Sequence, residues 1–167
     1  MVALAPAIAV IALGNEWRGD DAAGLELLQL LRRDPPERVA LSAVQGDATH
    51  LLAALEQRAA VVLVDAVVTG AAPGTVHCWR WRDGHPALAD LRLSTHKTSL
   101  IDALALAEAL GRRRPELIVV GIEAAQFTLG AALSPAVASA LDEAVVRVYG
   151  ELRRLEEGLT TACTSSR

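Results

Sequence analysis

The chain has 167 residues, of which 52% are hydrophobic and 22% charged, so its length fits one domain with a substantial core and excludes disorder of the whole chain. Sixteen basic against twenty acidic residues give a net charge of −4, and only 3% of the residues are aromatic. These values argue against a phosphate-backbone binder and a base-stacking surface, so no nucleic-acid partner is expected.

The first half of the chain alternates predicted strands and helices. Residues 7–13 form a short apolar run that ends at Gly14, which is typical of a strand buried on both faces. Residues 20–33 carry apolar side chains at helical spacing, with Asp20 or Asp21 as the expected N-cap. After this helix we expect a second strand, a helix and a strongly apolar strand, at residues 37–44, 48–58 and 59–68.

The second half continues the alternation. Residues 75–84 predict an exposed, antiparallel edge strand, and residues 94–113 a loop followed by a helix that ends at Gly111. A buried strand at 116–123 and a long helix at 134–157, with Pro135 in its first turn, complete the pattern. This order predicts an α/β fold, a three-layer α/β/α sandwich whose central sheet is mostly parallel with one antiparallel edge strand. We expect a single domain over residues 1–157 and a flexible C-terminal tail over residues 158–167.

The apolar N-terminal segment predicts a strand, because it lacks a basic n-region and is shorter than the roughly 20 residues needed to span a bilayer. Cys78 and Cys163 lie far apart in the sequence and form no disulfide framework or metal-binding CxxC motif. We therefore expect a cytoplasmic protein with no membrane partner, and a monomer.

Polar side chains follow several predicted strands at their carboxyl ends, where parallel α/β folds place their sites. Asp65 is the most informative, because VVLVD sets a carboxylate at the end of an apolar strand, where desolvation is costly without a cation or donors. The alternative is an Asp that caps local backbone amides, and the spacing gives the two roles equal weight. Helix capping is the favoured role of Asp20, which leaves Asp21 available for other work.

His96 lies in a polar loop, where an exposed histidine without a function is the commoner case. The remaining histidines are expected to have surface roles: His50, His77 and His85. Asp21, Asp65 and His96 would nevertheless form a three-ligand set that suits a divalent ion such as Zn²⁺ or Ni²⁺ and leaves one position open. The sequence contains no G-x-S-x-G elbow, no H-E-x-x-H helix and no phosphate-binding loop motif.

An ordered series of short motifs runs through residues 7 to about 150. The series comprises Gly14-Asn15, Asp20-Asp21, Gly24, Val64-Asp65-Ala66, Pro73-Gly74-Thr75, Ser94-Thr95-His96, Val120-Gly121-Ile122, Leu133-Ser134-Pro135 and Val137. Each motif is weak alone, but the set in this order and at these intervals is specific, and it resembles the [NiFe]-hydrogenase maturation endopeptidases.

The resemblance implies an endopeptidase that removes a short C-terminal extension from the precursor of a hydrogenase large subunit once nickel has been inserted. The metal-site positions of the family fall on Asp21, Asp65 and His96, which are therefore the candidate catalytic and metal-contacting residues. Nickel, carried by the precursor, is the implied metal, and Zn or another divalent ion is an alternative occupant. The large-subunit precursor is the implied partner.

Two segments depart from the family pattern. Val44-Gln45-Gly46-Asp47 stands where many members carry Asp-Gly-Gly-Thr, which leaves open which hydrogenase is served. The proline common after the Gly-Ile of the late strand is here Ala124 or Ala125, so this loop is expected to take another shape. Neither departure removes a candidate metal ligand.

Two mechanisms stay open on the sequence. A divalent ion held by the protein would polarise the scissile carbonyl or activate a bound water, or else the three ligands would dock onto nickel already in the precursor. Asp20, Glu16 or Glu123 could assist as a base. The alternative functions are a non-catalytic nickel-binding or chaperone-like partner of the large subunit, and an unrelated hydrolase of small molecules.

Overall fold

The computed structural model describes residues 7–45, 48–56, 58–81, 92–93 and 97–164. Its strands, all in one sheet, are β1 (Ile8–Leu13), β2 (Val39–Val44), β3 (Ala60–Val68), β4 (Val76–Trp81), β5 (Arg92–Leu93) and β6 (Glu116–Glu123). Its helices are the 3-10 turn η1 (Gly19–Ala22), α1 (Ala23–Arg33), α2 (Ala48–Leu55), α4 (Lys97–Ala109) and α5 (Pro135–Thr164).

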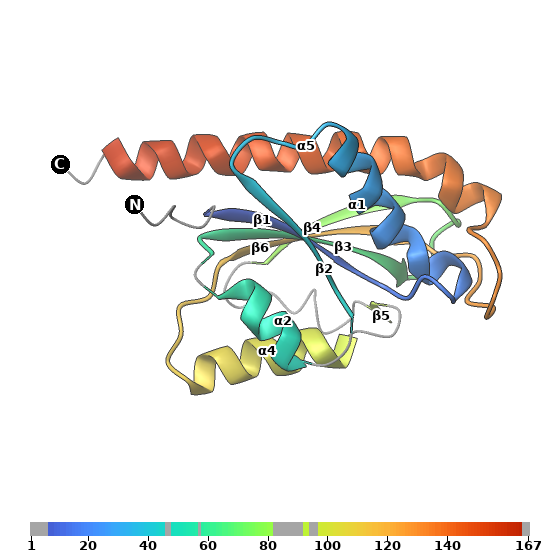
Figure 1. The fold of residues 1–167 in the computed structure, drawn as a ribbon, viewed down its shortest axis with the longest axis horizontal. Helices are drawn as coiled ribbons and strands as arrows, with labels where there is room; N and C mark the ends of the chain where they lie inside the picture. Colours follow the sequence, from blue (N-terminus) through green and yellow to red (C-terminus); the bar gives the residue numbers. More distant parts are fainter. Residues whose placement is uncertain (1–6, 46–47, 57, 82–91, 94–96, 165–167) are drawn as a thin grey trace.

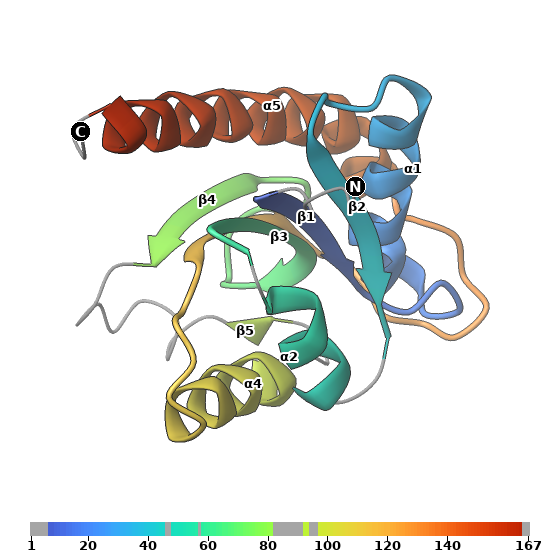
Figure 2. The same ribbon diagram turned by 60° about the vertical axis from the view of Figure 1, so that its left-hand side comes forward.

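The sheet has the order β2-β1-β3-β6-β4, and β5 pairs with the end of β3. Strands β2, β1, β3 and β6 are parallel, whereas β4 is antiparallel to β6 and β5 is antiparallel to β3. Helices α1 and α5 cover one face of the sheet, and α2 and α4 cover the other (Figures 1 and 2). The predicted three-layer fold, with a mostly parallel sheet and an antiparallel edge strand, is confirmed.

Two apolar cores lie on the two faces of the sheet, because successive strand residues point to opposite sides. On the α1/α5 face, Val62 and Ile118 pack with Leu27 and Val148. On the α2/α4 face, Leu63 and Val119 pack with residues such as Leu52 and Leu100. This double burial explains why β1, β3 and β6 have continuous apolar sequences.

The order in which strands are added to the sheet reverses between β1 and β3. From β1 the chain goes to β2 on one side, and it then returns to β3 on the other side of β1, with β6 beyond β3. Gly24, in the first turn of α1, lies directly over this point. A Cβ atom on Gly24 would stand 2.5 Å from the carbonyl oxygens of both Leu13 and Val64. Only glycine therefore lets the helix approach the carboxyl ends of β1 and β3 so closely, and such a switch point is where parallel α/β sheets bind ligands.

Several predicted boundaries are wrong. The helix predicted over 20–33 begins as η1 and becomes α-helical at Ala23, and the helix predicted over 48–58 ends at Leu55. The final helix continues to Thr164, beyond its predicted end at residue 157. The division into one domain and a flexible tail stays a prediction.

Helix α5 is fixed to the edge strand β4 by a charged cluster. Glu151, buried on α5, accepts hydrogen bonds from Arg80 of β4 at 2.7 and 3.1 Å and from Arg154 at 3.2 Å. Burial raises the pKa of Glu151, but the two guanidinium groups outweigh it and hold this pKa below its usual value. Within the described ranges, no helix combines the length and the apolar character that a membrane span requires.

Candidate functional site

Asp65 lies in β3 at the switch point. The pairing between β3 and β1 ends at Val64, the residue before Asp65. Asp65 itself pairs with Gly121 of β6. The side chain is only 1% exposed, and its Oδ1 accepts a hydrogen bond of 2.8 Å from the Ala66 amide. The strand predicted over residues 59–68 is confirmed as β3, but the placement of Asp65 at its end is wrong, because β3 continues to Val68.

Asp21 reaches the same region from η1, the turn between β1 and α1. Its backbone holds this loop closed: the Asp21 carbonyl accepts from the Asn15 amide at 3.2 Å, and the Asp21 amide donates to the Arg18 carbonyl at 3.2 Å. Gly14 has a φ of 142°, and a Cβ there would stand 2.1 Å from the Asp21 carbonyl oxygen. Since η1 contacts β3 and Asp21 is fully buried, two buried carboxylates lie at the carboxyl end of the sheet.

Asp20 has a different role from Asp21. Its carboxylate is fully buried and accepts from the amides of Ala125, Gln126 and Ser134 at 2.8, 3.0 and 2.6 Å, and from the Ser134 hydroxyl at 2.9 Å. The Asp20 amide also donates to the Gln126 carbonyl at 3.0 Å. Asp20 thus ties the loop after β1 to the loop between β6 and α5.

The predicted capping of the first helix by Asp20 or Asp21 is wrong. The residues at the N-cap positions are Arg18 for η1 and Ala22 for α1, and neither provides a side-chain capping bond. Asp20 instead satisfies amides of residues 125, 126 and 134.

His96, the third predicted ligand, lies outside the described residues. On one side of it in the sequence, Leu93 of β5 pairs with Val67, two residues after Asp65. On the other side, α4 begins at Lys97. In the part of the chain that the structure describes, no group of three His, Cys, Asp or Glu side chains could hold a metal ion. The ligand set of Asp21, Asp65 and His96 therefore stays a prediction.

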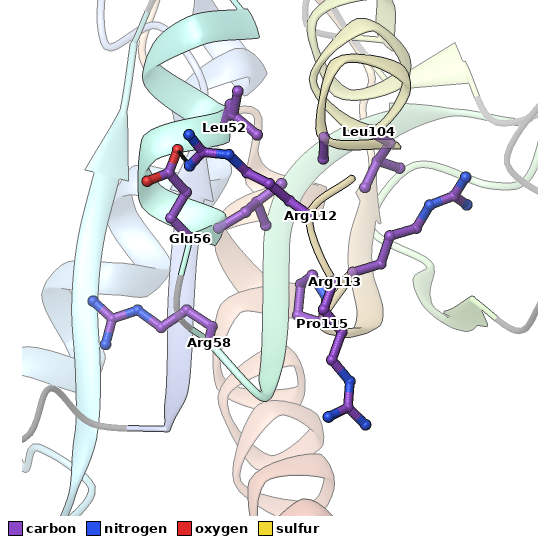
Figure 3. A pocket seen from close by; sticks show the side chains of 10 residues that line it. Leu52, Glu56, Arg58, Leu104, Arg112, Arg113 and Pro115 are labelled. Carbon is purple, nitrogen blue, oxygen red and sulfur yellow. Dashed lines mark ion pairs between the residues drawn. The ribbon is translucent and has the colours of Figure 1, made fainter. Parts of the chain in front are cut away.

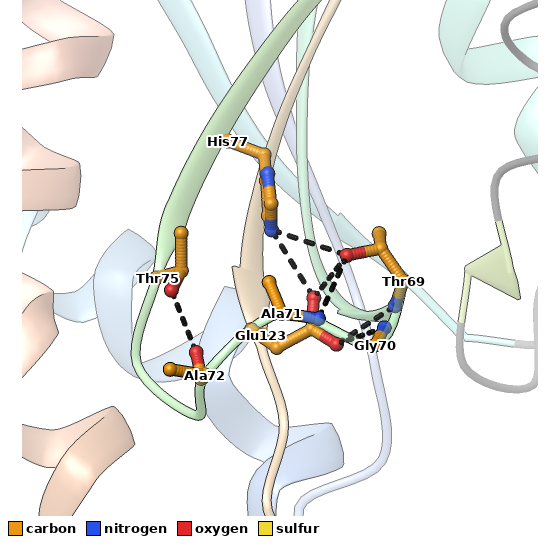
Figure 4. Close-up of polar contacts among 7 residues, drawn as sticks. All are labelled: Thr69, Gly70, Ala71, Ala72, Thr75, His77 and Glu123. Atoms are coloured by element: carbon orange, nitrogen blue, oxygen red, sulfur yellow. Dashed lines mark hydrogen bonds and ion pairs between the residues drawn. The ribbon is translucent and has the colours of Figure 1, made fainter.

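Glu123, at the end of β6, organises the neighbouring turn between β3 and β4 (Figure 4). Its side chain is 2% exposed; Oε1 accepts from the Thr69 and Gly70 amides at 2.7 and 2.9 Å, and Oε2 accepts from the Thr69 hydroxyl at 2.8 Å. His77 Nε2 lies 3.1 Å from the same Oε2, and its ring stacks on Trp79. The surface role predicted for His77 is therefore wrong. Its partner is 46 residues away in the sequence, so no local pattern around His77 could indicate this contact.

The contacts of Asp20, Glu16 and Glu123 do not support the suggestion that one of them assists as a base. Burial raises the pKa of Glu123, but the hydrogen bonds from Thr69, Gly70 and His77 outweigh it and hold the pKa below its usual value. Asp20 uses both oxygens to accept four hydrogen bonds, and Glu16 is exposed in the loop after β1. The buried carboxylates of Asp20 and Glu123 therefore hold loops in place through hydrogen bonds.

Replacing Glu123 by glutamine should lower the free energy of unfolding by about 1–3 kcal/mol at pH 7, because a buried charged acceptor of several hydrogen bonds is lost. A carboxyl group with a depressed pKa in the folded state stabilises the protein above its unfolded pKa of 4.5 and loses this contribution as the pH falls through the folded value. The difference between wild type and Glu123→Gln should therefore shrink below pH 4.5. Urea unfolding at pH 7, 5 and ~3.5 measures it, with the exposed Glu143→Gln as control; equal differences at every pH would contradict the assignment.

Cys78 is not suited to be a thiolate nucleophile. Burial, followed by the nearby Glu151 carboxylate, raises the pKa of this thiol to about 11. Cys78 lies on β4, where it packs against the apolar core of the α1/α5 face.

A pocket of about 430 Å³ opens at the opposite edge of the sheet (Figure 3). Its lining includes Arg58 and Pro115, which lie just before the amino ends of β3 and β6, and leucines of α2 and α4. Arg112 in this pocket forms an ion pair with Glu56. The pocket is thus separated by the length of the parallel strands from Asp21 and Asp65, and among the described residues that line it Glu56 is the one carboxylate.

A family model described as hydrogenase maturation protease matches residues 27–151. The hydrogenase expression/formation protein HupD of Rhodobacter capsulatus is 27% identical over 162 residues, which cover 95% of this chain and 77% of that protein. HupM of Azotobacter chroococcum mcd 1 is 30% identical over 148 residues, covering 87% of this chain and 71% of HupM.

Solved structures agree with these sequence relatives. The hydrogenase maturating endopeptidase HybD from E. coli superimposes with a TM-score of 0.75 at 27% identity, covering 88% of this chain and 92% of HybD. The [NiFe] hydrogenase maturation protease HybD from Thermococcus kodakarensis gives a TM-score of 0.70 at 29% identity, with 87% and 97% of the two chains covered. The range matched by the family model includes Asp65 and begins after Asp21.

Proposed function

The chain belongs to the hydrogenase maturation protease family, and we propose that it is an endopeptidase that removes the C-terminal extension of a nickel-loaded [NiFe]-hydrogenase large-subunit precursor. The observation that carries the proposal is the pair of buried acids, Asp21 and Asp65, at the switch point of a fold that this family shares. We further propose that the reaction takes place in the cytoplasm and that the enzyme acts as a monomer.

The burial of the two acids supports a role in contacting a cation. A carboxylate taken out of water loses hydration free energy, and a nearby divalent cation compensates this loss. Asp21 and Asp65 are 0% and 1% exposed, respectively. We therefore propose that they recognise the nickel already inserted in the precursor, which makes the metal part of the substrate.

Position in the sequence supports His96 as the third contact. Leu93, three residues before His96, pairs with Val67, two residues after Asp65. An imidazole nitrogen beside two carboxylates is a donor set that suits Ni²⁺, and it would equally accept Zn²⁺ or another divalent ion. Three donors leave coordination positions for the precursor's own ligands, which a nickel-reading protease requires.

The proposed reaction adds water across a peptide bond and releases a C-terminal peptide. In this proposal Asp21, Asp65 and His96 bind the nickel-loaded region and so orient the scissile bond beside the carboxyl end of the sheet. The burial of both acids keeps bulk water away from them, which strengthens their attraction to the cation.

Incubating the purified protein with nickel-loaded precursor should convert the precursor to a form that lacks its C-terminal peptide, as measured by intact-protein mass spectrometry. His96→Ala should slow this conversion by about 100-fold or more, since it removes one of three proposed contacts to the metal. The exposed His50→Ala on α2 is the matched control and should process the precursor at the wild-type rate.

Two outcomes would overturn the proposal. A precursor that binds the protein but keeps its mass would indicate a non-catalytic, chaperone-like partner. Rapid turnover of generic esters or short peptides would indicate an unrelated hydrolase, because the proposed enzyme requires the folded, nickel-loaded precursor.

A further inference from the structure

Two large apolar side chains lie exposed on adjacent loops at the carboxyl end of the sheet. Trp17, in the loop after β1, is 67% exposed, and Leu129, in the loop between β6 and α5, is 76% exposed. The Gly130 amide donates a hydrogen bond of 2.8 Å to the Trp17 carbonyl, which joins the two loops at this point. Both views show these loops side by side (Figures 1 and 2).

The loops that carry the Trp17–Leu129 pair are held rigidly. Asp20 bonds to the amides of Ala125, Gln126 and Ser134 across the two loops. Gly19 has a φ of 56°, and a Cβ there would stand 2.5 Å from the Gln126 side chain. A rigid surface loses little conformational entropy when a partner binds, so it is preorganised for recognition.

Other exposed large apolar residues differ in their setting. Leu106 and Leu110 lie on or just after α4, and Val146 and Leu159 on α5, where single exposed apolar residues are ordinary. Val68, the last residue of β3, is 38% exposed, much less than Trp17 or Leu129. The Trp17–Leu129 pair instead follows the same two strands, β1 and β6, whose carboxyl ends border the buried acids. Trp17 is four residues from Asp21 in the sequence.

We propose that the Trp17–Leu129 pair is the docking surface for the folded body of the large-subunit precursor, which it contacts while the precursor's nickel site faces Asp21 and Asp65. This inference rests on the proposed function and adds the contact that determines substrate affinity. Tryptophan in particular is enriched among the few residues that dominate protein–protein binding. Arg18, whose guanidinium lies 5.4 Å from the Phe127 ring, places a positive charge at the edge of this surface.

The test is the cleavage kinetics of nickel-loaded precursor by the double variant Trp17→Ser/Leu129→Ser. We expect KM to rise by about tenfold or more with kcat within about twofold of wild type, because an interface contact is lost while the buried acids stay in place. The control Leu110→Ser/Val146→Ser removes two exposed apolar side chains elsewhere and should leave both constants unchanged.

Binding measured without cleavage separates this inference from the proposed function. In an Asp65→Asn background, the Kd for nickel-loaded precursor should rise by about tenfold or more on adding the two serine substitutions, and circular dichroism should confirm the fold. If the wild-type enzyme cleaves the precursor and the double variant has the same KM and Kd as its parent, the docking surface is wrong and the proposed function stands. Absence of cleavage by the wild-type enzyme would overturn the proposed function itself.

Discussion

Asp65→Asn should reduce processing of nickel-loaded precursor by about 100-fold or more while the free energy of unfolding stays equal to wild type or rises slightly. The substitution keeps the shape of the side chain but removes a buried negative charge that the proposed reaction uses. A charge kept at an apolar site for function costs stability, so its removal relieves that cost. Time courses of precursor mass and urea unfolding of the free enzyme measure the two quantities.

The matched control is Asp142→Asn, which removes an exposed acid on α5 and should change neither quantity. The opposite pattern would contradict the assignment. If Asp65→Asn lost about 1 kcal/mol or more of stability and retained processing, the charge of Asp65 would have a structural role and Asp65 would be no part of the site.

Asp20→Ala should lower the free energy of unfolding by about 3 kcal/mol or more. It leaves the amides of Ala125, Gln126 and Ser134 without their acceptor, and each buried donor left unsatisfied costs about 1–3 kcal/mol. Processing should fall as well, because the loops that position Asp21 lose their connection. Urea unfolding and hydrogen exchange of residues 124–134 measure the effect.

Ser134→Ala is the control for this prediction, since it keeps the three backbone donors to Asp20 and removes only the Ser134 hydroxyl, which donates to Asp20 and accepts from the Val137 amide at 3.4 Å. It should cost about 1 kcal/mol. The neighbouring Asp21→Asn should instead lower processing without a comparable loss of stability. If Asp20→Ala and Asp21→Asn had the same effects on stability and activity, the division of roles between the two acids would be wrong.

The layers of the fold were predictable because apolar periodicity records burial directly. Strands such as β3 and β6 are buried on both faces and therefore read as continuous apolar runs, and the half-buried β4 shows the alternation of an edge strand. Element ends were less predictable. Nothing local marked the 3-10 turn η1, because its acidic residues at positions 20 and 21 match an ordinary helix start.

The hydrogen-bond partners of the buried acids could not be predicted. Asp20 bonds to residues 105 to 114 positions away, and Glu123 to residues 46 to 54 positions away, so only the assembled sheet brings these groups together. The motif series includes Asp20, Gly24 and Ser134 but does not indicate their roles. In the structure, Asp20 bonds to Ser134 across two loops, and Gly24 lets α1 approach the carboxyl ends of β1 and β3.

The most direct test of the central claim compares nickel-loaded and nickel-free precursor under the same enzyme, with intact mass as the readout. The chelator-treated enzyme should cleave the nickel-loaded precursor and leave the nickel-free precursor uncut, because in this proposal Asp21, Asp65 and His96 bind the cation that the loaded precursor supplies. Efficient cleavage of nickel-free precursor by the chelator-treated enzyme would contradict nickel reading and would indicate a protease in which Asp21 and Asp65 act as acid and base without a metal.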